Sequence, residues 1–153
     1  MTARSFVDTN IWVYAVDEDE PAKQERAKAA LATAEMTGIV VSAQVLGEFY
    51  VTVTRKLATP LPQDAALDYV HAMMRQSVVS LDARLVSAAI AGTREWGIAY
   101  WDALIIAAAE AGGCSTVLTE DLQHGATYGS VRVENPFLTA RPPTPHSVHE
   151  SST

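Results

Sequence analysis

The chain has 153 residues, 48% of them hydrophobic, and its 18 acidic and 11 basic residues give a formal net charge of −7. This length predicts one domain with a sizeable core, and the acidic balance argues against a protein that binds nucleic acid through bulk positive charge. A single cysteine, Cys114, excludes a disulfide framework and a cysteine zinc site. The N-terminus has no secretory pattern, and no apolar run approaches the roughly 20 residues of a membrane span. We therefore expect a cytoplasmic protein without membrane contact.

Short apolar strands alternate along the chain with alanine-rich or amphipathic helices. We expect helices where strong helix formers or apolar residues recur at helical spacing, with prolines or glycines at their ends. In chain order, the expected elements are a strand ending at Asp8, a helix over 22–34, a strand over 39–41, a helix from 43 to about 57 capped by Ser42, a helix over 64–76, a strand over 78–81, a helix over 83–96, a helix headed by Asp102, and strands over 116–119 and 131–133.

This alternation predicts the α/β class, with a mostly parallel five-stranded sheet flanked by helices in three layers. The domain is expected to span residues 1–138. From about Thr139 the composition turns to Pro, Ser, Thr and His, which predicts a disordered C-terminal tail over 139–153. Because sites in such sheets form outside the carboxyl ends of the strands, the residues directly after each strand are the first candidates.

Carboxylates stand at several of these places. Asp8 follows the first strand and Asp121 follows the fourth, Asp102 heads a helix with seven apolar residues behind it, and Glu48 flanks the apolar stripe of its helix. Taken singly, these acids also fit turn residues, a helix cap and a solvated helix glutamate. Together they would raise one another's pKa unless a divalent cation compensated their charge, and all-oxygen ligation suits Mg²⁺ or Mn²⁺.

Four stretches of the chain resemble, in order and spacing, the motifs of the PIN domain and, more narrowly, of the VapC-type toxins of bacterial toxin–antitoxin systems. They are FVDTN at 6–10, SAQVLGEFY at 42–50, YWDALI at 100–105 and LTEDLQHG at 118–125. The resemblance covers about residues 5–137. It implies a three-layer PIN-like fold that uses an acidic Mg²⁺ or Mn²⁺ site to cut RNA.

The resemblance also implies roles for single residues. The expected catalytic set is Asp8, Glu48, Asp102 and Asp121, with the metal ion on the three aspartates. The expected supporting polar groups are Thr9, Asn10 and Thr119. Asn10 is expected to orient Asp8, Glu120 to be an additional acidic neighbour, and His124 is considered as a further neighbour because it follows Asp121 by three residues.

The implied function is a metal-dependent endoribonuclease that acts as the toxin of a type II toxin–antitoxin pair. RNA is the implied substrate, a small VapB-like antitoxin the implied partner, and a homodimer the implied assembly. We expect the antitoxin to cover the first two helices, with Trp12, Tyr14 and the alanine-rich face of 22–34.

Other functions stay open at this point. A non-toxin PIN-domain RNA-processing nuclease and a non-catalytic scaffold would share the fold. A haloacid-type phosphatase or a receiver domain would also place an aspartate after its first strand. The phosphatase, however, needs a second aspartate where Asn10 stands. The receiver needs a lysine after a late strand, and none of the three lysines stands there, since they are Lys23, Lys28 and Lys56.

Overall fold

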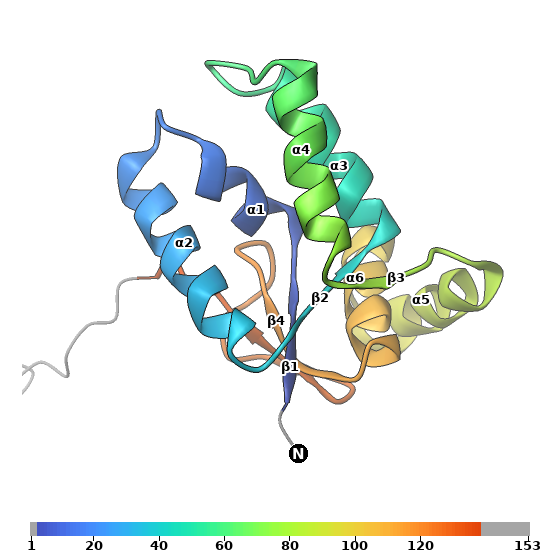
Figure 1. Ribbon diagram of the computed structural model, residues 1–153. Coiled ribbons are helices and arrows are strands. Elements are labelled where there is room, and N and C mark those ends of the chain that lie inside the picture. Colours follow the sequence, from blue (N-terminus) through green and yellow to red (C-terminus); the bar gives the residue numbers. More distant parts are fainter. Residues whose placement is uncertain (1–2, 139–153) are drawn as a thin grey trace, which may run out of the picture.

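Six strands form one sheet in the order β3-β2-β1-β4-β6-β5 in the computed structural model, which describes residues 3–138 (Figure 1). All neighbouring strands are parallel except β5 and β6. The predicted fold class is confirmed, with one strand more than the five expected. The additional strand, β5, has two residues that form a hairpin with β6. So short a segment cannot show the alternation of apolar and polar residues by which a strand is predicted from sequence. The strands are β1 Arg4–Val7, β2 Ile39–Ser42, β3 Ser77–Val79, β4 Cys114–Leu118, β5 Thr127–Tyr128 and β6 Val131–Glu134.

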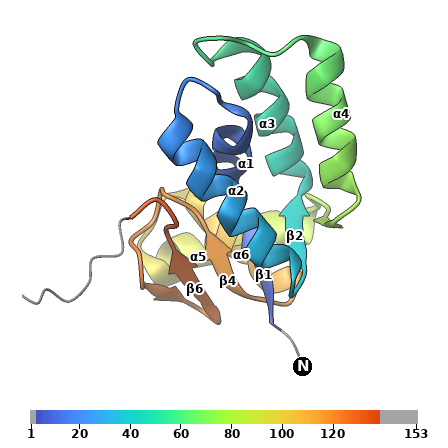
Figure 2. The ribbon, with the colours of Figure 1, turned by 60° about the vertical axis from the view of Figure 1, so that its left-hand side comes forward.

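Helices cover both faces of this sheet. Figure 2 shows α2 crossing the near face, α5 and α6 behind the sheet, and α3 and α4 standing beyond the end of β2. This is the three-layer arrangement that the alternating elements predicted. The helices are α1 Thr9–Val16, α2 Pro21–Glu35, α3 Ala43–Arg55, α4 Gln63–Met74, α5 Ala83–Trp96 and α6 Tyr100–Ala111.

Local chemistry sets several helix ends. The Asp8 side chain accepts a hydrogen bond from the backbone N–H of Thr9 and occupies the N-cap of α1. Ser42 caps α3 by accepting from the N–H of Val45, as predicted. Gly97 ends α5 with φ of +66°, a left-handed conformation that a residue without Cβ adopts readily.

The apolar run of α6 forms the centre of the core. All seven residues from Ala103 to Ala109 are buried, and α6 packs against β1, β2, β4 and β6 as well as α5. Asp102 lies in the first turn of this helix. A carboxylate at this place is therefore carried on a rigid, deeply packed element, as a metal ligand requires.

The register of β1 and β4 brings the ends of two strands together. Val7 pairs with Leu118, and the N–H of Asp8 donates to the carbonyl of Leu118 at 3.0 Å. After β1 the chain builds β2 and β3 on one side and later β4 and β6 on the other. Because ligands bind at such a switch in strand order, the residues after Val7 and Leu118 occupy the favoured position for a site.

Two further predictions concern the chain as a whole. None of the helices within residues 3–138 has the length and apolar character needed to cross a bilayer. The predicted tail over 139–153 lies outside the described residues.

Candidate functional site

A pocket of about 380 Å³ opens where β1 and β4 end, and we call it the acidic pocket. Thr9, Asn10 and Tyr14 contribute polar groups to its lining. Of the residues that the structure describes, none of those lining this pocket is basic. The lining contains six carboxylic acids, which are Asp8, Asp17, Glu20, Glu48, Glu120 and Asp121.

Asp8 is the most deeply buried of these acids and exposes only 7% of its surface. Its Oδ2 accepts from the Thr119 hydroxyl at 2.8 Å, and its Oδ1 accepts from the N–H of Thr9 at 2.7 Å. Burial raises the pKa of Asp8 to about 6, against these two hydrogen bonds, and the charges of Asp121 and Glu48 raise it further. Near neutral pH, Asp8 therefore carries negative charge in a pocket whose described lining offers no base to compensate it.

Asp121, which follows β4, is held by Asn10, which follows the neighbouring strand β1. The Asn10 Nδ2 donates to Asp121 Oδ2 at 3.1 Å, and the Asn10 Oδ1 accepts from the N–H of Glu120 at 3.3 Å. The direct contacts to the carboxylate of Asp8 come from Thr9 and Thr119, and Asn10, which was expected to orient Asp8, contacts Asp121 instead. Burial raises the pKa of Asp121, and the Glu120 charge adds to this, while the hydrogen bond from Asn10 lowers it.

Thr119 joins the two strand ends. It is fully buried, and its hydroxyl donates to Asp8 and accepts from the N–H of Asp121 at 3.1 Å. The Nδ2 of Asn10 also lies 3.4 Å from this oxygen. A single hydroxyl thus links the carboxylate of Asp8 to the backbone of Asp121.

Glu48 reaches the acidic pocket from α3. Its Oε1 accepts from the Thr9 hydroxyl and its Oε2 from the Gln44 amide, each at 3.0 Å. The contact between Thr9 and Glu48 ties α3 to the first turn of α1. Glu48 is exposed, as the solvated-helix interpretation expected, but its two oxygens are held in place by two donors.

Asp102 stands apart from the other three predicted acids. It does not line the acidic pocket, and the N-cap position of α6 belongs to Ala99, so the helix-cap interpretation is wrong. Burial raises the pKa of Asp102, and the charge of Asp121 raises it further. The structure therefore places Asp8, Glu48 and Asp121 in one pocket and Asp102 within electrostatic reach of Asp121.

The donor types of this region fit a hard divalent cation. The residues lining the acidic pocket offer carboxylate, hydroxyl and amide oxygens, and these are the ligands that Mg²⁺ and Mn²⁺ prefer. Burial first, and the neighbouring acids second, raise the pKa of Asp8, Asp102 and Asp121, so a cation close to them would favour their charged forms. Within residues 3–138, however, no three His, Cys, Asp or Glu side chains converge closely enough to hold a metal ion. Ligation would require the acids to approach one another more closely.

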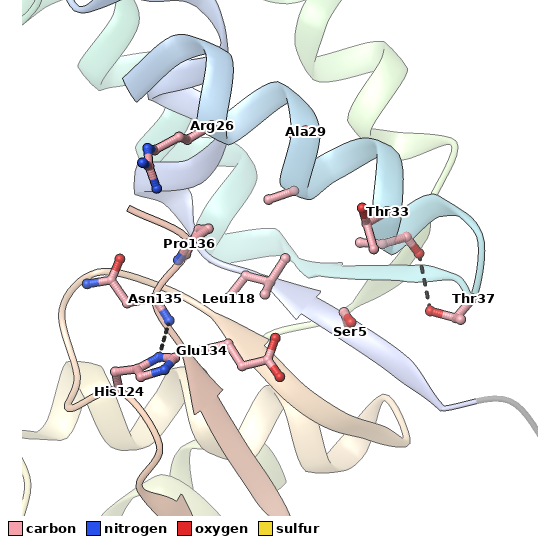
Figure 3. A pocket seen from close by; sticks show the side chains of 12 residues that line it. Ser5, Arg26, Ala29, Thr33, Thr37, Leu118, His124, Glu134, Asn135 and Pro136 are labelled. Carbon is pink, nitrogen blue, oxygen red and sulfur yellow. Dashed lines mark hydrogen bonds between the residues drawn. The ribbon is translucent and has the colours of Figure 1, made fainter. Parts of the chain in front are cut away.

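His124 belongs to a different part of the molecule. A hollow of about 500 Å³ lies between α2 and the side of the sheet that carries β4 and β6, and we call it the α2 hollow (Figure 3). His124 lines it, and its Nδ1 accepts from the N–H of Asn135 at 3.0 Å. The structure therefore gives no support for His124 as a neighbour of the acids.

Sequence reasoning missed Lys23, which stands beside the acidic pocket. Its Nζ donates to Glu120 Oε1 and to the Tyr14 hydroxyl, each at 3.1 Å. Glu120 is the additional acidic neighbour that was expected, but its pairing with a lysine was not. These partners are 97 positions apart, and no local pattern indicates such a contact.

The sequence of the chain also matches a known protein family. A family model of the PIN domain matches residues 5–129. The chain belongs to the PIN domain family. The resemblance that the four motifs carried is confirmed at this level, and PIN domain proteins are generally nucleases that use divalent metal ions.

Solved structures support the same fold. A toxin–antitoxin complex from Klebsiella pneumoniae superposes with a TM-score of 0.64 at 18% identity and covers 87% of this chain and 98% of its own. VapC20 of Mycobacterium tuberculosis, a sarcin–ricin loop cleaving toxin, has a TM-score of 0.55 at 21% identity over 74% of this chain and 86% of its own. VapBC2 of Rickettsia felis, bound to a promoter DNA fragment, has a TM-score of 0.58 at 18% identity over 86% and 97%. A comparison with curated protein sequences gave no match.

Proposed function

We propose that this PIN domain is a metal-dependent endoribonuclease and the toxin of a type II toxin–antitoxin pair. The observation that carries the proposal is the acidic pocket, where Asp8, Glu48 and Asp121 gather at the switch in strand order without a basic residue in the described lining. Such a concentration of carboxylates lowers stability unless a cation binds. Hydrolysis of phosphodiester bonds is the chemistry that this arrangement supports best.

In this proposal Asp8, Asp102 and Asp121 hold Mg²⁺ or Mn²⁺, and the bound ion would polarise the phosphate and lower the pKa of the attacking water. The chain's own residues set the geometry around it. Thr119 aligns Asp8, and Asn10 aligns Asp121.

Glu48 has a separate role in the proposed reaction. Its two oxygens are held by donors from Thr9 and Gln44. A carboxylate fixed in this way, at the wall of the pocket that contains Asp8, is placed to accept the proton of the attacking water. Loss of the Thr9 hydroxyl would leave this acceptor less well oriented.

The toxin assignment draws on the solved structures that share the fold, several of which are toxins or toxin–antitoxin complexes. An acidic pocket without lining bases would attract an arginine side chain of an antitoxin, because a guanidinium pairs bidentately with carboxylates. A VapB-like antitoxin and a homodimer of this chain belong to the same proposal.

The structure allows the proposed antitoxin surface to be defined by fewer residues than the sequence indicated. Trp12 lines a hollow of about 310 Å³ formed by α1, α2, α3 and α4, together with Leu31 and Phe49. Tyr14 instead faces Phe137 and Lys23, so it lies beside the acidic pocket. We therefore place the apolar part of the antitoxin on Trp12 and its neighbours, and its basic side chain in the acidic pocket.

Purified protein tests the nuclease. It should cleave RNA with Mg²⁺ or Mn²⁺ and lose this activity with a chelator. Its melting temperature should rise by roughly 5–10 °C at an ion concentration about 100-fold above Kd, by mass action, and the Asp121→Asn variant should show a much smaller rise. A folded, active protein with no ion-dependent shift would overturn the carboxylate metal site.

Growth tests the toxin. Expression of the chain alone should arrest a bacterial host, the Asp8→Asn variant should not, and expression of the small gene beside it should restore growth. Cleavage in vitro combined with harmless expression would instead identify a non-toxin RNA-processing nuclease. A folded protein that cleaves no RNA would identify a scaffold.

A further inference from the structure

A second hollow adjoins the acidic pocket. It has a volume of about 340 Å³ and is lined by residues of α1 and α3 together with Lys56. Thr9, Glu48 and Thr52 line both spaces, so the two are parts of one continuous depression, which we call the joint groove. One part of the joint groove holds the acids, and the other extends along α3 to its C-terminal end.

Lys23 stands at the acid-rich end of the joint groove. Its ammonium group lies 4.4 Å from the centre of the Tyr14 ring and 5.3 Å from that of Phe137, and it donates to Glu120 and to the Tyr14 hydroxyl. An ammonium group has three N–H donors, and these two bonds use two of them. Because the side chain is 38% exposed, the third donor can bind a phosphate without loss of the contact to Glu120.

Lys56 stands at the other end. It is the exposed C-cap residue of α3, where its side chain lines the second hollow. Glu48 lies on the same helix, between Lys56 and the acids after β1 and β4. Lys56 thus lines the far end of the joint groove, and Lys23 flanks the acid-lined part through its contact with Glu120.

We propose that a single RNA strand lies in the joint groove, with backbone phosphates on Lys23 and on Lys56 and the bond to be cut over the acids between them; this rests on the proposed nuclease function. A chain with net charge −7 has no bulk attraction for a polyanion. Two lysines beside the acids can still hold backbone phosphates of the strand. Asp8 lies at the floor of the pocket with 7% exposure, and a strand that can bend reaches it more easily than a rigid duplex.

Salt dependence of RNA binding tests the two contacts. In the cleavage-impaired Asp8→Asn background with Mg²⁺, binding of a short unstructured RNA oligonucleotide is measured from low to moderate salt. Each phosphate contact contributes about 0.7 to the slope of log K against log salt for a single strand. Lys23→Met and Lys56→Met should each reduce the slope by about that amount, and the double variant by about 1.4. Methionine keeps the apolar stem of Lys23 over its aromatic neighbours.

Two controls separate phosphate binding from a structural role. Lys28→Met removes an exposed lysine from the same helix as Lys23, in a different hollow, and should leave the slope unchanged. Glu120→Gln breaks the same ion pair as Lys23→Met but keeps the lysine charge. It removes a negative charge from the acidic pocket, so it should bind RNA more tightly than the parent and should not show the reduced slope of Lys23→Met.

Several results would overturn the proposal. Parental slopes in both lysine variants of a protein that cleaves RNA would remove the joint groove as the RNA path and leave the nuclease intact. Equal binding of a duplex of the same sequence would overturn the single-strand assignment. A parent chain that neither binds nor cleaves RNA would overturn the joint groove and the proposed function together.

Discussion

The acidic pocket has a volume of about 380 Å³ and the α2 hollow about 500 Å³, yet the charges in the two spaces are arranged in opposite ways. In the α2 hollow, the basic side chain of Arg26 and the acidic side chain of Glu134 line the same space (Figure 3). In the acidic pocket, six carboxylic acids line the space without a basic residue among the described lining residues, and Lys23, which stands beside the pocket, pairs with one of them, Glu120. An excess of negative charge, and not volume, therefore distinguishes the candidate site.

The two spaces also differ in what builds them. The α2 hollow lies against Ala29, Ala30 and Thr33, small side chains that leave room between the helix and the sheet. The acidic pocket lies at the switch in strand order, where two parallel strand ends present consecutive polar residues. The first space results from the small side chains packed there. The second is lined by carboxylates whose mutual repulsion lowers stability, a cost that proteins commonly carry at functional sites.

The largest expected difference between the two spaces is catalytic. Asp8→Asn, Asp102→Asn and Asp121→Asn should each reduce RNA cleavage on the order of 1,000-fold, about 4 kcal/mol of barrier, because each removes a ligand charge from the proposed ion. Glu134→Gln neutralises a carboxylate of the α2 hollow and should cleave at the parental rate. Initial rates on a labelled RNA measure this. Parental activity in one of these variants would show that the substituted aspartate does not belong to the catalytic set.

The pH dependence of stability should single out Asp8. Its pKa is raised from 3.8 to about 6 in the folded state, so folding favours the protonated carboxyl. The resulting stabilisation is complete below about pH 4 and is lost as the pH rises through about 6. Relative to metal-free parent, Asp8→Asn should therefore gain stability over this window, by up to about 3 kcal/mol. Urea unfolding at several pH values with a chelator tests this, and parallel curves would contradict it.

A smaller effect is expected at Thr119. Thr119→Val removes the hydroxyl that donates to Asp8 and accepts from the Asp121 N–H, in a fully buried position. The free energy of unfolding at pH 7 should fall by about 1–2 kcal/mol, because both partners lose a bond. The control is Thr37→Val, because Thr37 is an exposed threonine of the α2 hollow whose hydroxyl makes one weak bond, at 3.4 Å to the carbonyl of Ala34. Equal losses in the two variants would remove the special role of Thr119.

The smallest effect is expected at His124. Its ring accepts one backbone hydrogen bond at the exposed edge of the α2 hollow. His124→Ala should change the free energy of unfolding by no more than about 0.5 kcal/mol, as is usual for surface positions. Cleavage should stay at the parental rate. A loss of activity in this variant, with stability unchanged, would show that the α2 hollow takes part in the reaction and would break the contrast between the two spaces.

The sequence by itself determined the features that depend on neighbours along the chain. The apolar run from Ala103 to Ala109 required a buried helix, Ser42 required a helix start, and short apolar segments required strands. Polar residues directly after such strands then fall at the same sheet edge in any parallel arrangement. For this reason the sequence alone is enough to group Asp8 with Asp121.

Only the tertiary structure decided which side chains touch. Asn10 contacts Asp121 and not Asp8, and Lys23 pairs with Glu120, across separations of 111 and 97 positions. The placement of these groups depends on the pairing of Val7 with Leu118 and on how α2 packs over the sheet, neither of which a local pattern encodes. Hydrogen bonds and ion pairs act over about 3 Å, so a register change of one residue would exchange every partner. The sequence therefore indicates which acids belong to the site, and the fold decides which hydrogen bonds and ion pairs join them.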